Sequence, residues 1–317
     1  MKKYAFGVDI GGTTVKMGFF SIQGELLDKW EIPTDTSENG KKIIPDIARA
    51  VQEKLDKEQI SRDEVKGIGM GVPGPVDSQG NVIKCVNLGW GIFNLEQAMK
   101  DATGFICKAG NDANVATLGE MFKGGGEGYQ NLVMLTLGTG VGGGVILDGK
   151  IVPGAFGAAG EIGHFPMVEG ETAVCGCGKT GCLEQYASAN GISRVAKLHL
   201  ENCSDPTVLR NVPEVNSKEI FDAAKSGDAV ALELVDGLGK ILGRACAMVS
   251  CVVDPEIIII GGGVSKAGSI VTETIAKHYV NYAFHASRNT RFGLAKLGND
   301  AGIYGGFKLI LDENAEG

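Results

Sequence analysis

Two stretches of the chain follow the same plan, and this repetition limits the folds open to it. Residues 4–20 (YAFGVDIGGTTVKMGFF) and residues 131–147 (NLVMLTLGTGVGGGVIL) each combine an apolar run, a Gly/Thr turn and a second apolar run. Each stretch therefore predicts a β-hairpin. Two half-molecules that arose by duplication would both open in this way. Two unrelated hairpins of a common type would give the same pattern, so this alternative stays open.

The rest of the chain alternates between predicted strands and helices, which indicates an α/β fold. A length of 317 residues suggests two domains. The 49 glycines imply many close backbone approaches, as occur at phosphate-binding loops. Further strands are expected at 25–32, 65–72, 105–110 and 256–263, the last of which runs into a glycine turn. Helices are expected at 43–55, 112–122, 228–253, 269–280 and 300–311, with Asp228 and Asp300 at the starts of two of them.

Charge and hydrophobicity exclude several classes of protein. The net charge of −8 argues against nucleic acid as a main partner, because neutralising phosphates needs a basic face. The first acid, Asp9, comes too early for a signal peptide, and the longest aliphatic run, 257–260, is too short to span a bilayer. We therefore expect a cytoplasmic protein without a membrane partner, in which the eight cysteines are reduced. Clustered cysteines would then favour a metal over disulfides.

Three glycine-rich loops follow predicted strands. In DIGGTT (9–14), backbone N–H groups and two hydroxyls suit a phosphate, and Asp9 could hold Mg2+ through water. A hairpin turn without a ligand is the other interpretation of this loop. LGTGVGGG (137–144) contains a formal G-x-G-x-x-G, but a strand follows where a dinucleotide site needs a helix. Together with IIIIGGG (257–263), these loops predict a nucleotide held between two lobes.

Two further motifs supply candidate acids and bases. GNDAN (110–114) places Asp112 between a predicted strand and a helix, where it could cap the helix or act as a general base on a substrate hydroxyl. AAGEIGHF (158–165) supplies Glu161 and His164. A helix would bring these two side chains together, although the glycines favour a loop.

The stretch VCGCGKTGCLEQ (174–185) is not a nucleotide loop. Residue 173 is Ala where the Gly-Lys-Thr motif of such a loop needs Gly. With His164 upstream, the stretch instead offers three thiolates and an imidazole, which are the donors of a closed, structural zinc site. A thiol redox pair is the alternative, but C-x-C is not its usual spacing. The zinc ligands would be His164, Cys175, Cys177 and Cys182.

A zinc site here would also fix polar side chains beside it. Glu161 and His164 precede the cysteines and Glu184 follows them. Carboxylates that accept hydrogen bonds from adjacent hydroxyls are suited to a sugar. The motif therefore predicts a scaffold for substrate recognition.

These motifs resemble the ROK family (repressors, open reading frames, kinases). ExGH at 161–164 and CGCGKTGCLE at 175–184 carry the resemblance, and DIGGTTVKMG, GVPGPVD, NLGW, GNDANVATLGE and LGTGVGGG match the family in order along nearly the entire chain. Among ROK members the chain is most similar to bacterial ATP-dependent glucokinases. The resemblance implies an α/β, actin-like ATPase fold with duplicated ribonuclease-H-like cores in two lobes around a cleft. The smaller lobe would comprise 1–118 with 301–317, and the larger lobe 119–300.

The resemblance also implies a role for each motif residue. Asp112 would be the general base that activates the 6-hydroxyl of glucose for attack on ATP. Sugar contacts would come from Gly74, Asn87, Asn111, Asp112, Glu161, His164 and Glu184. Contacts with ATP and Mg2+ would come from Asp9, Gly11, Gly12, Thr13, Thr14, Lys16, Gly138, Thr139, Gly140, Gly262 and Gly263. His164 would bind Zn2+ with one nitrogen and the sugar with the other.

Family members are commonly homodimers or homotetramers, and the resemblance implies the same here. Family repressors carry a DNA-binding helix-turn-helix before the DIGGT-like motif. We expect none here, because the motif begins within the first ten residues. One alternative is a kinase for another hexose: N-acetylmannosamine, N-acetylglucosamine, mannose, fructose or allose. The other is a sugar-sensing regulator without catalysis.

Overall fold

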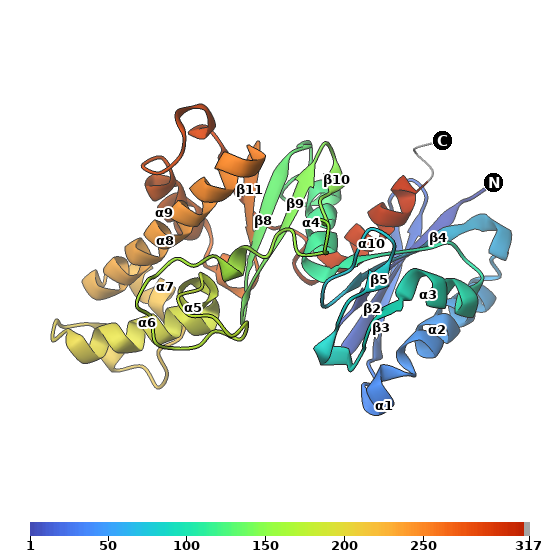
Figure 1. Cartoon of the computed structure of the whole chain (residues 1–317), viewed down its shortest axis with the longest axis horizontal. Coiled ribbons are helices and arrows are strands. Elements are labelled where there is room, and N and C mark those ends of the chain that lie inside the picture. The colour runs from blue at the N-terminus through green and yellow to red at the C-terminus, as the bar shows by residue number, and fades with distance from the viewer. Residues whose placement is uncertain (314–317) are drawn as a thin grey trace.

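The computed structural model describes residues 1–313 and consists of two α/β lobes, each built on a five-stranded sheet (Figure 1). The first sheet has the strand order β3-β2-β1-β4-β7, and the second has the order β10-β9-β8-β11-β12. In each sheet, the first three strands in this order are antiparallel and the last three are parallel. The repeat predicted from the two hairpins is therefore confirmed as a duplication of sheet topology.

The predicted hairpins form the centre of each sheet. The strands of the first sheet are β1 (Tyr4–Ile10), β2 (Thr14–Ser21), β3 (Leu26–Pro33), β4 (Val65–Val72) and β7 (Cys107–Asn111). Those of the second are β8 (Leu132–Leu137), β9 (Val141–Leu147), β10 (Lys150–Ile151), β11 (Ile257–Gly261) and β12 (Arg291–Leu294). A small ribbon of β5 (Asn81–Val82) and β6 (Phe93–Asn94) completes the first lobe.

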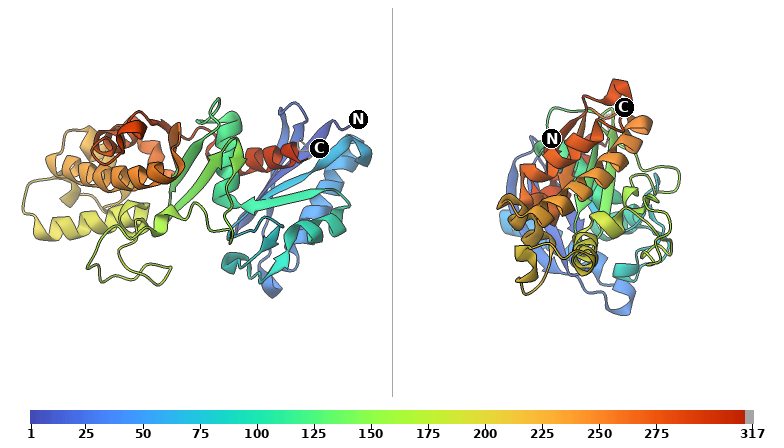
Figure 2. Two further views of the ribbon diagram at one scale, coloured as in Figure 1. Left: turned by 45° about the horizontal axis from the view of Figure 1, so that its top comes forward. Right: turned by 90° about the vertical axis from the view of Figure 1, so that its left-hand side faces the viewer.

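Helices cover the sheets and join the lobes. They are α1 (Ser37–Gly40), α2 (Ile43–Glu58), α3 (Leu95–Thr103), α4 (Asp112–Lys123), α5 (Glu184–Ala187), α6 (Ala189–Asn202), α7 (Ser217–Lys225), α8 (Ala229–Val253), α9 (Ser269–Tyr279) and α10 (Ala301–Asp312). Helices α4 and α10 lie in the middle of the molecule, between the two sheets (Figures 1 and 2). The chain passes between the lobes twice, through 124–131 after α4 and through 295–300 before α10.

Glycines allow α10 to lie directly on the first sheet and on α4. A side chain at Gly7 or Gly69 would overlap the backbone of α10, and one at Gly119 would overlap the carbonyl oxygen of Ala301. Only hydrogen at these positions permits backbone-to-backbone contact. The prediction that glycines serve phosphate loops was therefore incomplete, because several of them serve this helix packing.

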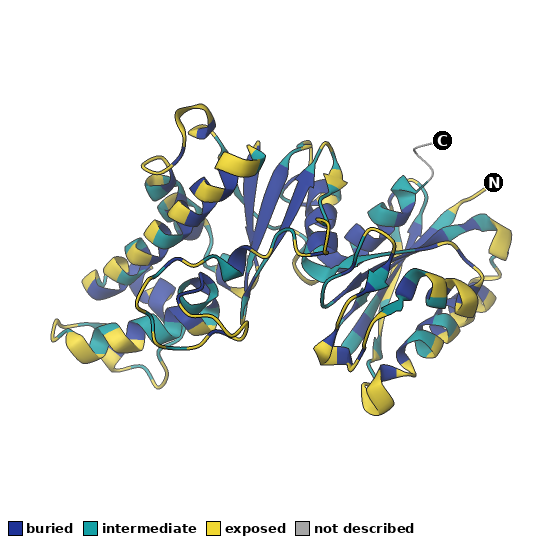
Figure 3. Ribbon diagram, in the orientation of Figure 1, coloured by how far each residue is buried: buried dark blue, intermediate teal, exposed yellow. Residues whose placement is uncertain are grey.

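Burial follows the hydrophobic pattern of the sequence. The central strands of both sheets are mostly buried, whereas the edge strands β3, β10 and β12 are partly exposed. The outer helices present one buried and one exposed face (Figure 3). Every residue of β11 is buried, as its run of four isoleucines predicts. Among residues 1–313, no helix has both the length and the hydrophobicity to cross a membrane.

The two predicted helix starts have different outcomes. The side chain of Asp228 accepts a hydrogen bond from the Ala231 N–H and caps α8, as predicted. Asp300 occupies the corresponding position before α10 but makes no capping hydrogen bond. Its carboxylate instead accepts from Nζ of Lys29 at 2.6 Å, across the first lobe. This tertiary ion pair takes the place of the cap.

Some elements of the structure were not predicted from the sequence. Strand β12 has only four residues and pairs with β11 at the edge of the second sheet. Four residues are too few to show a periodic hydrophobic pattern, so only the pairing with β11 identifies this segment as a strand.

Candidate active site and metal centre

Asp9 lies at the end of β1, beside the turn that leads into β2. The turn is closed by a hydrogen bond of 3.0 Å from the Gly11 N–H to the Thr14 carbonyl. Burial raises the pKa of Asp9, and the nearby charge of Lys16 opposes this rise. Nζ of Lys16 lies 3.5 Å from the Asp9 carboxylate and 3.3 Å from the Asn299 carbonyl. The predicted phosphate and metal residues of the first lobe therefore form one cluster.

The second glycine turn connects β8 and β9. The Gly138 N–H donates to the Gly140 carbonyl at 2.9 Å. A strand, β9, follows this turn where a dinucleotide-binding motif would have a helix, as predicted from the sequence. The Thr139 carbonyl accepts a hydrogen bond from the Asn190 side chain at the start of α6. A Cβ on Gly262 would lie 2.5 Å from the carbonyl of Leu137. The β8–β9 turn and the Gly262–Gly263 loop thus lie side by side.

Asp112 follows Asn111 at the start of α4. The sequence left open whether Asp112 caps this helix or is available to a substrate. Oδ1 of Asn111 accepts from the N–H groups of Ala113 and Asn114 at 3.0 and 3.2 Å, so Asn111 is the cap. Its Nδ2 donates to the Gly74 carbonyl at 3.2 Å and to Oδ1 of Asp112 at 3.0 Å. Within residues 1–313, Oδ2 of Asp112 accepts no hydrogen bond. One oxygen of Asp112 is therefore available to a substrate.

The surroundings of Asp112 favour its protonated form. Burial, and to a smaller extent the negative charges of Asp9 and Glu161, raise the pKa of Asp112 to about 6. These charges place the end of β1, the start of α4 and the ExGH segment within electrostatic reach of one another. A carboxyl whose pKa lies near neutrality is suited to general base catalysis.

The other two predicted sugar residues of the first lobe are Gly74, in the segment after β4, and Asn87, in a 3-10 turn at Val86–Leu88. Gly74 is held through its carbonyl by Asn111. A Cβ on Gly12 would lie 3.9 Å from the Cβ of Asn87. The NLGW loop therefore faces the β1–β2 turn.

The ExGH segment forms a single turn of 3-10 helix, Ile162–His164, with Glu161 just before it. This turn brings Glu161 and His164 together: Oε2 of Glu161 lies 3.8 Å from Nε2 of His164. The other ring nitrogen, Nδ1, lies 3.8 Å from Sγ of Cys175. The two nitrogens of His164 therefore face different partners.

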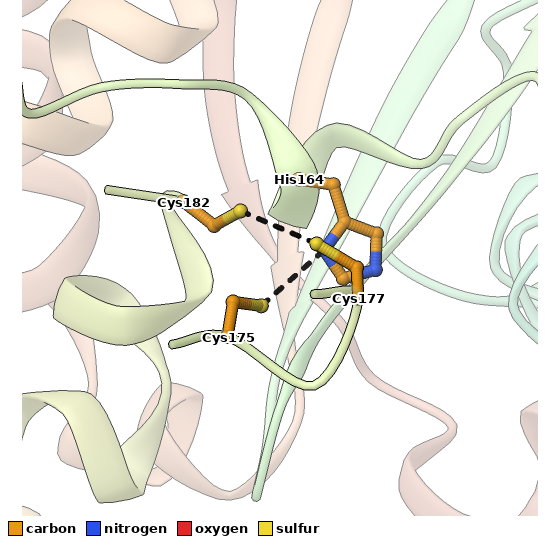
Figure 4. A group of neighbouring side chains, drawn as sticks. All are labelled: His164, Cys175, Cys177 and Cys182. Atoms are coloured by element: carbon orange, nitrogen blue, oxygen red, sulfur yellow. Dashed lines mark hydrogen bonds between the residues drawn. The ribbon is translucent and has the colours of Figure 1, made fainter. Parts of the chain in front are cut away.

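His164, Cys175, Cys177 and Cys182 point toward one another (Figure 4). Their ligand atoms all lie within 4.8 Å of one another, and the sulfurs of Cys177 and Cys182 are 3.6 Å apart. A tetrahedral zinc ion with Zn–S bonds of about 2.3 Å needs sulfurs about 3.8 Å apart. The donor set and its spacing therefore fit zinc.

Glu184 links the cysteine motif to the second glycine turn. Its Oε2 accepts from the Val141 N–H at 2.9 Å, and Sγ of Cys175 lies 3.6 Å from its Oε1. The carboxylate that the sequence assigned to a sugar thus also fastens the start of β9.

Three side chains that the sequence did not single out hold the loop before the cysteines. The Glu171 carboxylate accepts from Oη of Tyr186 at 2.5 Å and from the Arg194 guanidinium at 2.9 Å. The hydrogen bond from Tyr186, followed by backbone N–H groups and Arg194, lowers the pKa of Glu171 to about 2. Residues this far apart in sequence carry no common motif, so only the fold reveals the cluster.

A cavity of about 1030 Å³ lies between the lobes, along α4. Its lining includes Asn111, Asn114 and the β9–β10 hairpin, whereas Asp9, Asp112 and His164 lie outside it.

Comparison with known proteins identifies the family. The model of the ROK family matches residues 5–313. The chain belongs to the ROK family. A glucokinase of Halalkalibacterium halodurans is 42% identical over 316 residues, which cover 98% of this chain and 96% of that protein. A glucokinase of Thermotoga maritima is 38% identical, with 96% of each chain covered.

Solved structures of ROK proteins share the fold. A ROK family glucokinase from Streptomyces griseus, in complex with glucose and AMPPNP, is 32% identical with a TM-score of 0.73, and the match covers 96% of this chain and 98% of that one. The actin-like ATPase fold that the sequence resemblance implied is therefore confirmed.

Proposed function

We propose that this ROK protein transfers the γ-phosphoryl group of ATP to the 6-hydroxyl of glucose, giving glucose 6-phosphate and ADP. The observation that carries the proposal is Asp112 at the start of α4, whose Oδ2 accepts no hydrogen bond within residues 1–313 and whose pKa is raised to about 6 by burial and by the charges of Asp9 and Glu161. The glucokinase relatives, and the glucose and AMPPNP in the Streptomyces griseus structure, favour glucose and ATP as the substrates.

Asp112 would act as the general base. Its carboxylate accepts the proton of the 6-hydroxyl while that oxygen attacks the γ-phosphorus, and the bond from the γ-phosphorus to the β,γ-bridging oxygen breaks to release ADP. Phosphoryl transfer depends on positioning and charge stabilisation more than on covalent help from the protein. Asn111 positions Asp112 by capping α4 and donating to its Oδ1.

The glycine turns would hold the nucleotide. Asp9 and Lys16 lie together beside the β1–β2 turn, where a carboxylate can hold Mg2+ through water and an ammonium can approach a phosphate. Backbone N–H groups of both hairpin turns can donate to phosphate oxygens. This role is assigned to Asp9, Gly11, Gly12, Thr13, Thr14, Lys16, Gly138, Thr139, Gly140, Gly262 and Gly263.

Groups on both lobes would bind the sugar. Glu161 and His164 face the site from the second lobe, and the fixed position of His164 between Cys175 and Glu161 orients its ring. Zinc would supply structural support by holding the ExGH turn and the cysteine loop together. The full set of proposed sugar ligands is Gly74, Asn87, Asn111, Asp112, Glu161, His164 and Glu184.

The organisation of the whole protein is also a proposal. We assign the smaller lobe to 1–118 with 301–317, of which 314–317 lie outside the described residues, and the larger lobe to 119–300, which counts the end of α4 and both connecting segments with the larger lobe. A zinc site of reduced thiolates suits the cytoplasm. We propose a homodimer or homotetramer, which light scattering on the purified protein would test.

The experiment that tests the function is the initial rate of ADP release with ATP and Mg2+ across a sugar panel. The panel contains glucose, mannose, fructose, allose, N-acetylglucosamine and N-acetylmannosamine. The largest kcat/KM with glucose supports the proposal, and a clear preference for another hexose replaces the substrate but keeps the mechanism. Sugar binding without any ADP release would favour a sugar-sensing regulator.

A further inference from the structure

Glu120 is a buried carboxyl that the reaction itself does not use. It lies in the third turn of α4 and has no exposed surface. Within residues 1–313, all hydrogen bonds to its carboxylate come from backbone N–H groups. Gly125 donates to Oε2 at 2.7 Å, Lys296 donates to both oxygens at 2.9 and 3.1 Å, and Leu297 donates to Oε1 at 2.8 Å.

These donors lie on the two segments that connect the lobes. Gly125 belongs to the passage 124–131 from α4 to β8, and Lys296 and Leu297 belong to the passage 295–300 from β12 to α10. The carbonyl of Glu120 also accepts from the N–H groups of Gly124 and Gly126. One residue therefore fastens both passages to the same turn of α4.

The surrounding glycines have no space for side chains. A Cβ on Gly124 would overlap the Glu120 carboxylate, and one on Gly125 would overlap the carbonyl of Leu294. The first passage consequently runs backbone to backbone against the end of β12, directly before the second passage, and the carboxylate bonds to both passages. Buried polar groups that are fully hydrogen-bonded in this way fix one geometry, because any shift leaves donors without partners.

This arrangement is connected to the candidate site at both ends. Asp112 begins the helix that carries Glu120, eight residues or about 12 Å away along the axis. The second passage continues from Leu297 to Asn299, whose carbonyl accepts from Lys16, and then to α10, where Gly302 packs on Asp9. A shift of either passage at Glu120 would therefore move Asp112 and Asp9 relative to the second lobe.

Resting on the proposed kinase function, we propose that Glu120 is a positioning residue that sets the axis of lobe closure. Its carboxylate holds both passages at one point of α4, so that the second lobe moves as a unit toward Asp112. Closure of this kind excludes water and completes a kinase site. The residue touches neither substrate and acts through the two passages.

The test compares Glu120→Gln with the wild type. The amide has one oxygen and one NH2 group, so it presents a donor to N–H groups that need an acceptor. We expect kcat with glucose and ATP to fall at least about tenfold, since a misplacement of about 1 Å between reacting groups can cost about 100-fold. We also expect small-angle scattering to show a decrease in radius of gyration when glucose and AMPPNP are added to the wild type, and a smaller or absent decrease in the variant.

A matched control separates this role from simple destabilisation. Ser250→Ala removes the buried hydrogen bond from Oη of Tyr279 to Oγ of Ser250 (2.9 Å), within the second lobe and away from both passages. This control should lower the melting temperature but keep wild-type kcat and compaction. Wild-type kcat and compaction in Glu120→Gln would overturn the proposal.

Two further outcomes are also decisive. If Glu120→Gln does not fold, Glu120→Asp, which keeps the charge but is one methylene shorter, is measured in the same way. Failure of both variants to fold would overturn the proposal, because the carboxylate would then be needed for the fold itself. If the wild type releases no ADP with any sugar, the proposed function fails, and the scattering comparison still decides the role of Glu120 in closure.

Discussion

Replacing Asp112 with Asn should greatly reduce turnover and at the same time stabilise the protein. Burial and the charges of Asp9 and Glu161 raise the pKa of Asp112 to about 6, so the folded protein holds this proton more tightly than the unfolded chain does. Ionisation of Asp112 therefore disfavours folding. The stability associated with its protonated form is fully present below pH 3.8 and is lost as the pH rises through about 6.

The magnitude follows from the two pKa values. At about 1.36 kcal/mol per pH unit, the difference between 3.8 and about 6 corresponds to on the order of 3 kcal/mol at neutral pH. Asp112 is partly exposed, and solvent reduces the effect, so we expect about half of this value. The melting temperature of Asp112→Asn should then rise by roughly 2–5 °C at pH 7.5. At pH 4.5 most of this gain should disappear.

The assay pairs calorimetry at the two pH values with sugar-dependent ADP release. Loss of a general base should lower kcat by about 10²–10⁴-fold. The control is Asp101→Asn, which replaces an exposed carboxylate on α3. It should leave both the melting temperature and kcat close to the wild-type values. Near wild-type turnover in Asp112→Asn would refute the assignment of the base. An unchanged or lower melting temperature at pH 7.5 would refute the reasoning from burial and charge.

Three further predictions follow from the same site. The kcat/KM for the sugar should fall as the pH is lowered through about 6, because protonated Asp112 cannot accept the hydroxyl proton; a profile that stays flat to pH 5 would contradict this. Elemental analysis should find about one zinc per chain, and Cys177→Ala should lose it and weaken sugar binding. An unchanged sugar Kd in that metal-free variant would rule out the scaffold role. Gly302→Ala would place a Cβ 2.6 Å from Cγ of Asp9, so displacement of Asp9 should raise KM for magnesium-ATP; steady-state kinetics with an unaltered KM would speak against that role.

Local features of the sequence were sufficient to predict most elements that carry the site. The hairpins around Asp9 and Thr139 follow from apolar runs separated by turn residues, and these signals act over a few positions. The metal donors were predictable for the same reason, because three of the four lie within eight residues. The choice between Asn111 and Asp112 as the cap of α4 was not predictable. Both side chains can cap a helix, and the Gly74 carbonyl, 37 positions earlier, orients the Asn111 amide.

By itself, the sequence determined the strand–turn–strand repeats, the acid at the end of the first strand and the cysteine spacing, because hydrophobic periodicity and turn chemistry are properties of neighbouring residues. Only the tertiary structure decided that Glu120 joins the two passages between the lobes, and that glycines such as Gly69 and Gly119 serve the packing of α10. Those roles depend on backbone groups brought together from distant positions. The N–H donors reach the Glu120 carboxylate, and α10 packs on these glycines, only when the two lobes have formed.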